Sequence, residues 1–299
     1  MESSEREYYT RQGPLTDPRN EVARFDGLPS TVAELRDVVQ GLIIHVFWAQ
    51  RYGVSVPDDR MGELQLRSVP EKLRRLMELD DRPITQARQP QKRLLGNCRD
   101  FSVMLCSMLR QRGKPARARC GFATYFAPNH FEDHWVCEYL DAPGRWVMVD
   151  SQLDALQRER LAIDFDPLDV PSDRFLVGGK AWQMCRAGNA DPDTFGIGDL
   201  HGFGFVRGNL VRDIASLNKV ELLPWDAWGL MISEEKQVTE SDLELLDKAA
   251  VPSVAAGDRF QEVRSLYLNS DTLRVPPVIR SYRASGFENV EVGRRFSLE

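Results

Sequence analysis

The stretch "RLLGNCRDFSVMLCSMLRQRGKPARARCGF", residues 93–122, decides the fold. After a short loop, apolar residues recur at helical spacing, at Phe101, Met104, Leu105, Met108 and Leu109. Gly113 and Pro115 then end the predicted helix, and residues 116–126 alternate as a strand does. Cys98 stands ahead of the apolar stripe, so packing does not require a cysteine at that position.

Two further strands are predicted downstream. "HWVCEYL" spans residues 134–140, "DAPG" is typical of a turn, and "RWVMVD" spans residues 145–150. A helix followed by three strands is most simply an antiparallel meander with the helix packed on it, which predicts an α+β fold. His134 begins one predicted strand and Asp150 ends the next.

Cys98, His134 and Asp150 form a candidate catalytic triad. A helix N-terminus presents free N–H groups and a positive dipole end, which favour a thiolate and can hold an oxyanion. His134 and Asp150 are 16 positions apart (150 − 134), on strands joined by a turn. If those strands pair, the carboxylate can orient the imidazole while its other nitrogen faces the thiol.

These blocks resemble the core of the transglutaminase-like superfamily, over roughly residues 85–155. The resemblance rests on "GNCRDF", on "LRQRG" followed by "PAR", on the aromatic after His134, and on "GRWVMVD". It implies a papain-like fold with Cys98 as nucleophile, His134 as general base and Asp150 as the orienting acid. The chain as a whole resembles large bacterial proteins that carry such a core with a helical tail.

The resemblance also implies a reaction. A thiolate attacks the carbonyl of an amide, ester or thioester acyl donor, and an amine or water resolves the thioester acyl-enzyme. We expect amide formation by transfer to an amine, with an amide or peptide hydrolase as the alternative. A binding protein that keeps the fold without turnover is the second alternative. No cofactor and no metal site is expected.

Each residue of the triad has rivals. Asp154 and Asp141 compete with Asp150, and Asp100 near Cys98 would stabilise the helix N-terminus but also oppose a thiolate. His130 forms an H-x3-H pair with His134 that favours a metal site only weakly, His45 fits a core position, and His201 fits a flap over the site. The side-chain oxyanion donor stays open among Trp48, Gln50, Gln91 and Asn97. The remaining thiols, Cys106, Cys120, Cys137 and Cys185, fit packing roles.

Composition bounds the function classes. The 299 residues are 42% hydrophobic and 28% charged, with net charge −6 and a pI near 5.5, which disfavours nucleic acid and anionic membranes as partners. A polar N-terminus, no apolar run of membrane-spanning length and five cysteines favour a cytoplasmic protein. No oligomeric state is predicted.

We expect three regions: a loosely ordered N-terminus (1–30), the catalytic core (31–155) and a mainly helical extension packed on the core (156–299). Beyond the core stretch, periodicity predicts helices at 31–52, 69–80, 172–188, 209–221, from 241, and 258–269. The glycine-rich residues 195–208 are interpreted as a flexible loop, because no phosphate-binding motif follows.

Overall fold

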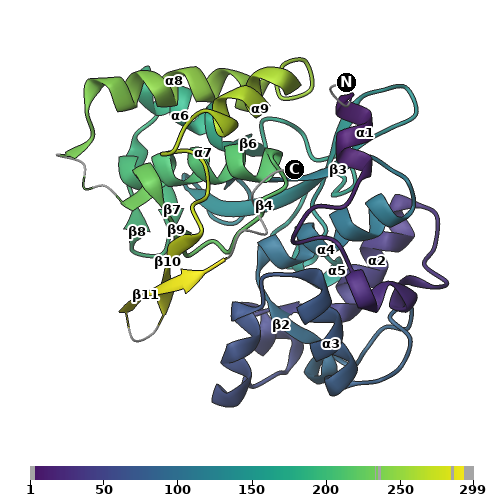
Figure 1. The fold of residues 1–299 in the computed structure, drawn as a ribbon. Helices are drawn as coiled ribbons and strands as arrows, with labels where there is room; N and C mark the ends of the chain where they lie inside the picture. Colours follow the sequence, from purple (N-terminus) through teal and green to yellow (C-terminus); the bar gives the residue numbers. More distant parts are fainter. Residues whose placement is uncertain (1–3, 233, 235–236, 284–285, 293–299) are drawn as a thin grey trace. The chain divides into compact units, whose positions relative to one another are not determined.

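The structure is a computed structural model that describes residues 4–232, 234, 237–283 and 286–292. Inter-residue contacts divide the chain into two compact units. The first unit is Met1–Ala118 with Val136–Val170, and the second is Arg119–Trp135 with Pro171–Glu299. The division falls within two strands of the core, and the expected regions 1–30, 31–155 and 156–299 stay a prediction. Figure 1 shows the elements in chain order.

The first unit contains most of the predicted core. Its helices are α1 (Glu5–Thr10), α2 (Val32–Leu42), α3 (Val69–Leu79), α4 (Cys98–Gln111) and α5 (Ala155–Arg160). Its strands are β1 (Ile43–His45), β2 (Leu94–Gly96) and β5 (Trp146–Val149), with the first residues of β3 (Ala116–Ala123) and the last of β4 (Phe131–Leu140). The predicted core helix and its three following strands are therefore present. β4 and β5 pair antiparallel, with Cys137 opposite Val149.

The helix predicted over 31–52 is interrupted. Thr31 and Glu34 cap the N-terminus of α2 as a capping box, but the helix ends at Leu42. Ile43–His45 instead form β1, which pairs in parallel with β2, Ile43 opposite Leu94 and His45 opposite Gly96. Helical periodicity continues through this segment, and the pairing with a strand fifty residues away overrides it.

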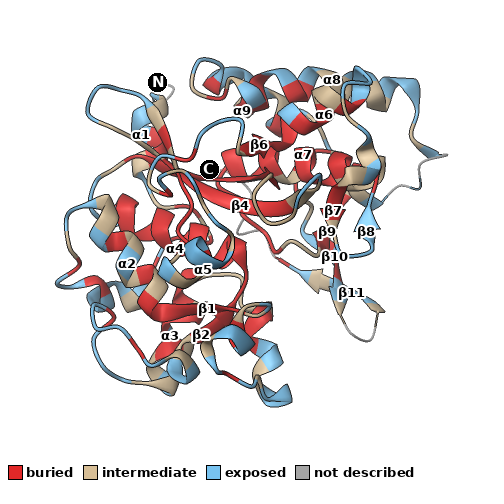
Figure 2. Ribbon diagram, turned by 180° about the vertical axis from the view of Figure 1, so that it is seen from behind, coloured by how far each residue is buried: buried red, intermediate tan, exposed pale blue. Residues whose placement is uncertain are grey.

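Helix α4 is buried along almost its whole length, from Cys98 to Arg110 (Figure 2). The periodicity predicted one apolar stripe along this helix, whereas its polar positions are buried as well. Two of its polar residues bond to the N-terminal segment: Ser107 Oγ donates to the Thr16 carbonyl (2.6 Å) and Arg110 Nη1 donates to Thr16 Oγ1 (2.7 Å). The residues before 30 thus cover one side of α4.

The N-terminal residues differ from the loosely ordered segment that we expected. Tyr9 is 1% exposed, and Leu15 and Phe25 are 4% exposed each. The guanidinium of Arg117 lies 3.7 Å from the Trp146 ring centroid and 5.3 Å from that of Tyr9, and donates to Glu5. The polar and charged composition of the N-terminal residues did not indicate these aromatic contacts, which attach α1 to the strands.

The second unit combines helices with short strands. Its helices are α6 (Gly178–Arg186), α7 (Phe203–Leu217), α8 (Glu240–Val254) and α9 (Phe260–Leu268). Its strands are β6 (Phe175–Val177), β7 (Phe195–Ile197), β8 (Leu200–His201), β9 (Asp226–Ala227), β10 (Val278–Arg283) and β11 (Gly286–Glu291). The strand order of the main sheet is β6-β3-β4-β7-β8 with β5 on β4, and β11-β10-β9 form a second sheet.

Several expectations for this unit are corrected. β7 pairs in parallel with β4, so the main sheet is mixed and not purely antiparallel. The glycine-rich residues form the β7–β8 hairpin and the start of α7. The helix predicted from 241 begins at Glu240, with a capping box between Thr239 and Asp242. The helix predicted from 172 begins only at Gly178, because residues 175–177 pair with β3. The sequence pattern also missed β9, β10 and β11.

Candidate active site

Cys98 is the first residue of α4 and is 7% exposed. Strand β2 leads directly into it through Gly96 and Asn97. A Cβ at Gly96 would stand 2.9 Å from Ile43 Cγ2 and 3.1 Å from Asp100 Oδ2, so only glycine fits this approach. The thiol is therefore held where the free N–H groups of the first helical turn begin.

The charge of Asp100 is neutralised inside the first unit. Its Oδ2 accepts the Asn97 backbone N–H at 3.0 Å, and its Oδ1 lies 3.0 Å from both Lys72 Nζ and Arg99 Nη1. Burial lowers the pKa of the Lys72 ammonium to about 8 against the attraction of Asp100. The Asp100 carboxylate therefore caps the N-terminus of α4. The positive charges of Lys72 and Arg99 offset its electrostatic effect on the neighbouring Cys98 thiol.

The four candidate oxyanion donors occupy different environments. Asn97 is buried and forms a capping box with Asp100, and its Nδ2 has no hydrogen-bond partner among the described residues. Trp48 is half-buried under the Arg51 guanidinium, at 4.8 Å, while Gln50 and Gln91 are exposed. Of the four, Asn97 combines burial with unused hydrogen-bond capacity next to Cys98.

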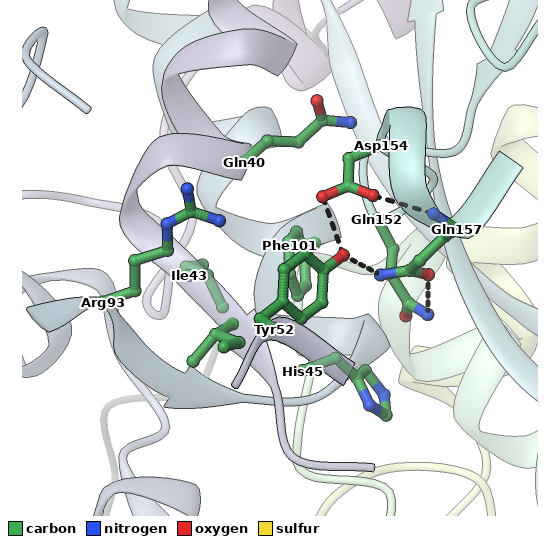
Figure 3. A pocket seen from close by; sticks show the side chains of 10 residues that line it. Gln40, Ile43, His45, Tyr52, Arg93, Phe101, Gln152, Asp154 and Gln157 are labelled. Carbon is green, nitrogen blue, oxygen red and sulfur yellow. Dashed lines mark hydrogen bonds between the residues drawn. The ribbon is translucent and has the colours of Figure 1, made fainter. Parts of the chain in front are cut away.

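Asp150 and Asp154 have distinct roles in the first unit. Asp150 follows β5, is fully buried, and accepts the Gln152 N–H on Oδ1 at 2.9 Å. Asp154 caps α5 by accepting the Gln157 N–H at 3.0 Å, and it accepts the Tyr52 hydroxyl at 2.7 Å (Figure 3). Helix capping explains Asp154 without catalysis.

A chain of polar side chains continues from Asp154, as Figure 3 shows. Gln157 Nε2 donates to the Tyr52 hydroxyl at 3.2 Å, and Gln152 Nε2 donates to Gln157 Oε1 at 3.1 Å. Burial raises the pKa of the Tyr52 hydroxyl, and its hydrogen bond to Asp154 raises it further. This network fixes the segment just after Asp150, and no pattern in the sequence pointed to Tyr52 or Gln157.

His134 belongs to the second unit, within β4, and is 1% exposed. Aromatic rings surround it, with centroids at 5.9 Å for Tyr125, 4.9 Å for Phe126 and 6.2 Å for Phe175. Three residues further along β4, Cys137 is opposite Val149, the residue before Asp150. Cys98 and Asp150 thus belong to the first unit and His134 to the second.

Asp133, the neighbour of His134 in β4, is held in place by a hydrogen bond from α7. Asp133 Oδ1 accepts from Asn209 Nδ2 at 2.8 Å, and the same amide donates to the Gly121 carbonyl at 3.1 Å. Burial raises the pKa of the Asp133 carboxyl. Asn209 on α7 therefore joins β3 and β4 next to His134, a function for the C-terminal half that the sequence did not reveal.

The other thiols and histidines have structural surroundings. Cys106 and Cys137 are buried with their Sγ atoms 3.2 Å apart, and burial raises the pKa of Cys137 well above its ordinary value. Burial also raises the pKa of Cys185 to about 11. His45 is buried, and its Nδ1 accepts the Phe47 backbone N–H. His201 is exposed, with its Nδ1 atom 3.5 Å from Asp193 Oδ1. Within the part of the chain that the structure describes, no three His, Cys, Asp or Glu side chains gather as metal ligands.

Comparison with known families identifies one region. The model of the transglutaminase-like superfamily matches residues 68–151, from the cap of α3 to the residue after Asp150. No curated protein and no solved structure matches the chain. Among the described residues, no helix has both the length and the apolar character needed to cross a membrane.

Proposed function

Residues 68–151 are a transglutaminase-like domain with an α+β fold, and on that premise we propose that the chain is a cysteine-dependent acyltransferase. The superfamily includes cysteine-based acyltransferases and hydrolases, and also members without catalysis. The observation that carries the proposal is the position of Cys98 at the start of a buried helix. The Asp100 carboxylate in the first turn of this helix is paired with Lys72 and Arg99. Such a position favours a thiolate.

The proposed reaction proceeds through a thioester. His134 takes the proton of Cys98, and the Cys98 sulfur adds to the carbonyl carbon of an amide, ester or thioester donor. The backbone N–H of Cys98 and the Asn97 amide hold the oxyanion. His134 then protonates the leaving group, and the tetrahedral intermediate collapses to acyl-Cys98. An amine, deprotonated by His134, attacks the thioester and releases the amide and the free thiol.

Asp150 is proposed to orient His134 and to stabilise its protonated form. It is fully buried at the end of a strand, and the Gln152 N–H occupies one side of Oδ1. A buried carboxylate of this kind holds a fixed direction, which an orienting group requires. The proposed chemistry uses only these side chains and needs no cofactor.

Transfer to an amine is favoured over hydrolysis by the surroundings of His134. The imidazole is 1% exposed and faces the rings of Tyr125, Phe126 and Phe175. Rings of this kind restrict water near the base that would activate it. The alternatives to amide formation are an amide or peptide hydrolase with the same triad and a non-catalytic binding protein. The expected cytoplasmic location stays a prediction.

The proposal is tested with an activated thioester as acyl donor, with and without a primary amine. Intact-protein mass spectrometry should show one acyl group, located on Cys98 by peptide mapping, and the amine should remove it with formation of the amide. Cys98→Ala should show no adduct, and His134→Ala should acylate at least about 100-fold more slowly. Free acid as the main product would establish the hydrolase, and no adduct would leave the non-catalytic protein.

A further inference from the structure

Glu132 lies on β4 two residues before His134, and both residues belong to the second unit. Alternate residues of a strand point to the same face of a sheet. Asp133, between them, accepts from Asn209 of α7, so Glu132 and His134 point to the face of β4 turned away from α7. Two strand steps separate their Cα atoms by about 6.6 Å, and a nitrogen atom between the two side chains can hydrogen-bond to both.

The Glu132 carboxylate has no partner within the part of the chain that the structure describes. It is half-buried, and none of the described residues forms a hydrogen bond or an ion pair with it. The residue paired with it on β7 is Gly196, which has no side chain to offer. Burial raises the pKa of the Glu132 carboxyl, and the charges of His134 and His130 oppose that rise.

A comparison with Asp213 in the same unit shows what Glu132 lacks. Asp213 is fully buried, and Arg119 pairs with it at 2.8 Å. Among the described residues, the charged groups that act on Glu132 are two histidines and Asp133, with no lysine or arginine. Removing water from a carboxylate costs free energy unless a cation or a hydrogen-bond donor replaces that water. A cationic ligand would supply the replacement.

The aromatic rings around His134 favour the same kind of ligand. The ring centroids of Phe126 and Tyr125 lie 4.9 Å and 5.9 Å from that of His134. Aromatic rings attract ammonium groups to their faces, and a carboxylate adds a charge-assisted hydrogen bond. A carboxylate and aromatic rings beside one histidine therefore suit an alkylammonium ion better than a neutral or anionic molecule.

We propose that Glu132 binds the acceptor amine as its ammonium ion, so that the acceptors are cationic alkylamines. The inference rests on the proposed acyl transfer at Cys98 and names the class of its second substrate. Glu132 takes one proton of the ammonium group and passes it to water. The nitrogen lone pair then forms the C–N bond while His134 takes a second proton. The C–S bond breaks, its electron pair stays on the Cys98 sulfur, and the sulfur takes the proton from His134.

Binding is tested without chemistry in Cys98→Ala. n-Butylamine, which is cationic near neutral pH, and 1-butanol, its neutral analogue, are titrated at constant ionic strength. NMR follows the side-chain signals of the four histidines, and the signal absent from His134→Ala identifies His134. n-Butylamine should shift this signal to saturation, and 1-butanol should leave it unchanged. Nα-acetyllysine methylamide is titrated in parallel, and the tighter of the two cations identifies a free amine or a lysine side chain as the source of the ammonium group.

Variants made in Cys98→Ala locate the effect. Glu132→Gln removes the charge with little change in size and should weaken n-butylamine binding at least about tenfold, as expected for a hydrogen bond to a charged group. Glu132→Asp keeps the charge and should lose less affinity. Glu262→Gln, at an exposed glutamate on α9 of the same unit, is the matched control and should change the affinity by less than about twofold. A His134 signal that does not respond to n-butylamine, or an equal affinity in Glu132→Gln and Glu262→Gln, would overturn the ammonium site.

The chain with Cys98 intact separates this inference from the proposed reaction. Acyl-Cys98 is formed with the activated thioester, and its aminolysis is followed with n-butylamine and with methoxyamine, which is neutral near neutral pH. Glu132→Gln should raise the half-saturating concentration of n-butylamine at least about tenfold. The rate with methoxyamine should change by less than about twofold, because a neutral amine gains little from a carboxylate.

The two experiments fail independently. If acyl-Cys98 never forms, the proposed reaction is contradicted, and the binding titration alone decides whether Glu132 holds an ammonium ion. If acyl-Cys98 forms but Glu132→Gln and Glu262→Gln bind n-butylamine alike, the ammonium site is overturned and the reaction stays.

Discussion

At the scale of single residues, sequence order indicates some residues of the proposed site, and others are identified only by their contacts in the structure. Cys98, His134 and Asp150 stand out because each is at the end of a predicted element. Lys72 and Arg99 could not be identified in this way, because their role depends on contact with Asp100 inside the first unit. The same holds for Tyr52, which bonds Asp154 from more than a hundred residues away.

The two neighbouring carboxylates give a matched pair of variants. Asp150→Asn should lower kcat/KM by about 1,000-fold, because the imidazole loses its orienting charge. Asp154→Asn should keep kcat/KM within about twofold, since asparagine caps a helix as well as aspartate does. Steady-state kinetics with one thioester and one amine compares them. A larger loss in Asp154→Asn would mean that the orienting acid has been misassigned.

Lys72 gives a pH-dependent stability with a defined sign. Its pKa is lowered from 10.5 to about 8 in the folded chain, so between these values the unfolded chain binds more protons. The cost of burying the ammonium is fully present below pH 8 and disappears as the pH rises to 10.5. The free energy of unfolding of the wild type should therefore rise relative to Lys72→Met across this window, by up to about 3 kcal/mol.

Urea unfolding of both chains at fixed pH values measures the Lys72 effect. The other lysines and tyrosines titrate in both chains, so the difference between wild type and Lys72→Met isolates this residue. A difference that stays flat from pH 8 to 10.5, or falls, would show that the Lys72 pKa is not lowered.

At the scale of elements, local patterns predicted α3, α4, β4 and β5 well, because each has a clear period and end signals. Local patterns failed where pairing with a segment distant in the sequence determines the conformation. Ile43–His45 continue a helical pattern but pair with Leu94–Gly96. Residues 4–30 are polar in composition, yet within the first unit they bury Tyr8, Tyr9, Leu15, Phe25 and Leu28.

Thr16 tests the contact between the N-terminal segment and α4. Its hydroxyl accepts from buried Arg110, so Thr16→Val should lower the free energy of unfolding by about 2 kcal/mol, the range for a hydrogen bond to a charged group. Thr10→Val, at a partly exposed hydroxyl bonded to the Arg6 carbonyl, is the control and should cost less than about 0.5 kcal/mol. Equal effects in thermal unfolding would contradict the role given to Thr16.

At the scale of the whole molecule, the C-terminal half is part of a compact unit that includes residues 119–135. The second unit contains a buried ion pair that joins these two sequence regions. Asp213 on α7 accepts from Arg119 Nε at 2.9 Å and Nη2 at 2.8 Å, and also from Ser253 Oγ at 2.6 Å. Composition could not reveal this, because the partners are almost a hundred residues apart.

Asp213→Asn tests that pairing. Removing the charge leaves buried Arg119 without its carboxylate and should lower the free energy of unfolding by about 3–5 kcal/mol. Asp271→Asn, at an exposed side chain paired with Arg274, should change it by less than about 0.5 kcal/mol. Chemical unfolding followed by circular dichroism compares the two variants. Similar unfolding midpoints would show that the buried Asp213–Arg119 pair contributes no more to stability than the exposed pair.

The pH dependence of iodoacetamide alkylation tests whether Cys98 is a nucleophile that His134 activates. Peptide mass spectrometry locates the modified cysteine in the wild type, in His134→Ala and in the control His130→Ala. We expect Cys98 to react first, with a midpoint well below the value of about 8.5 for a free thiol, and we expect only His134→Ala to remove this reactivity. Alkylation of Cys98 no faster than that of the other four cysteines, or unchanged in His134→Ala, would contradict this expectation.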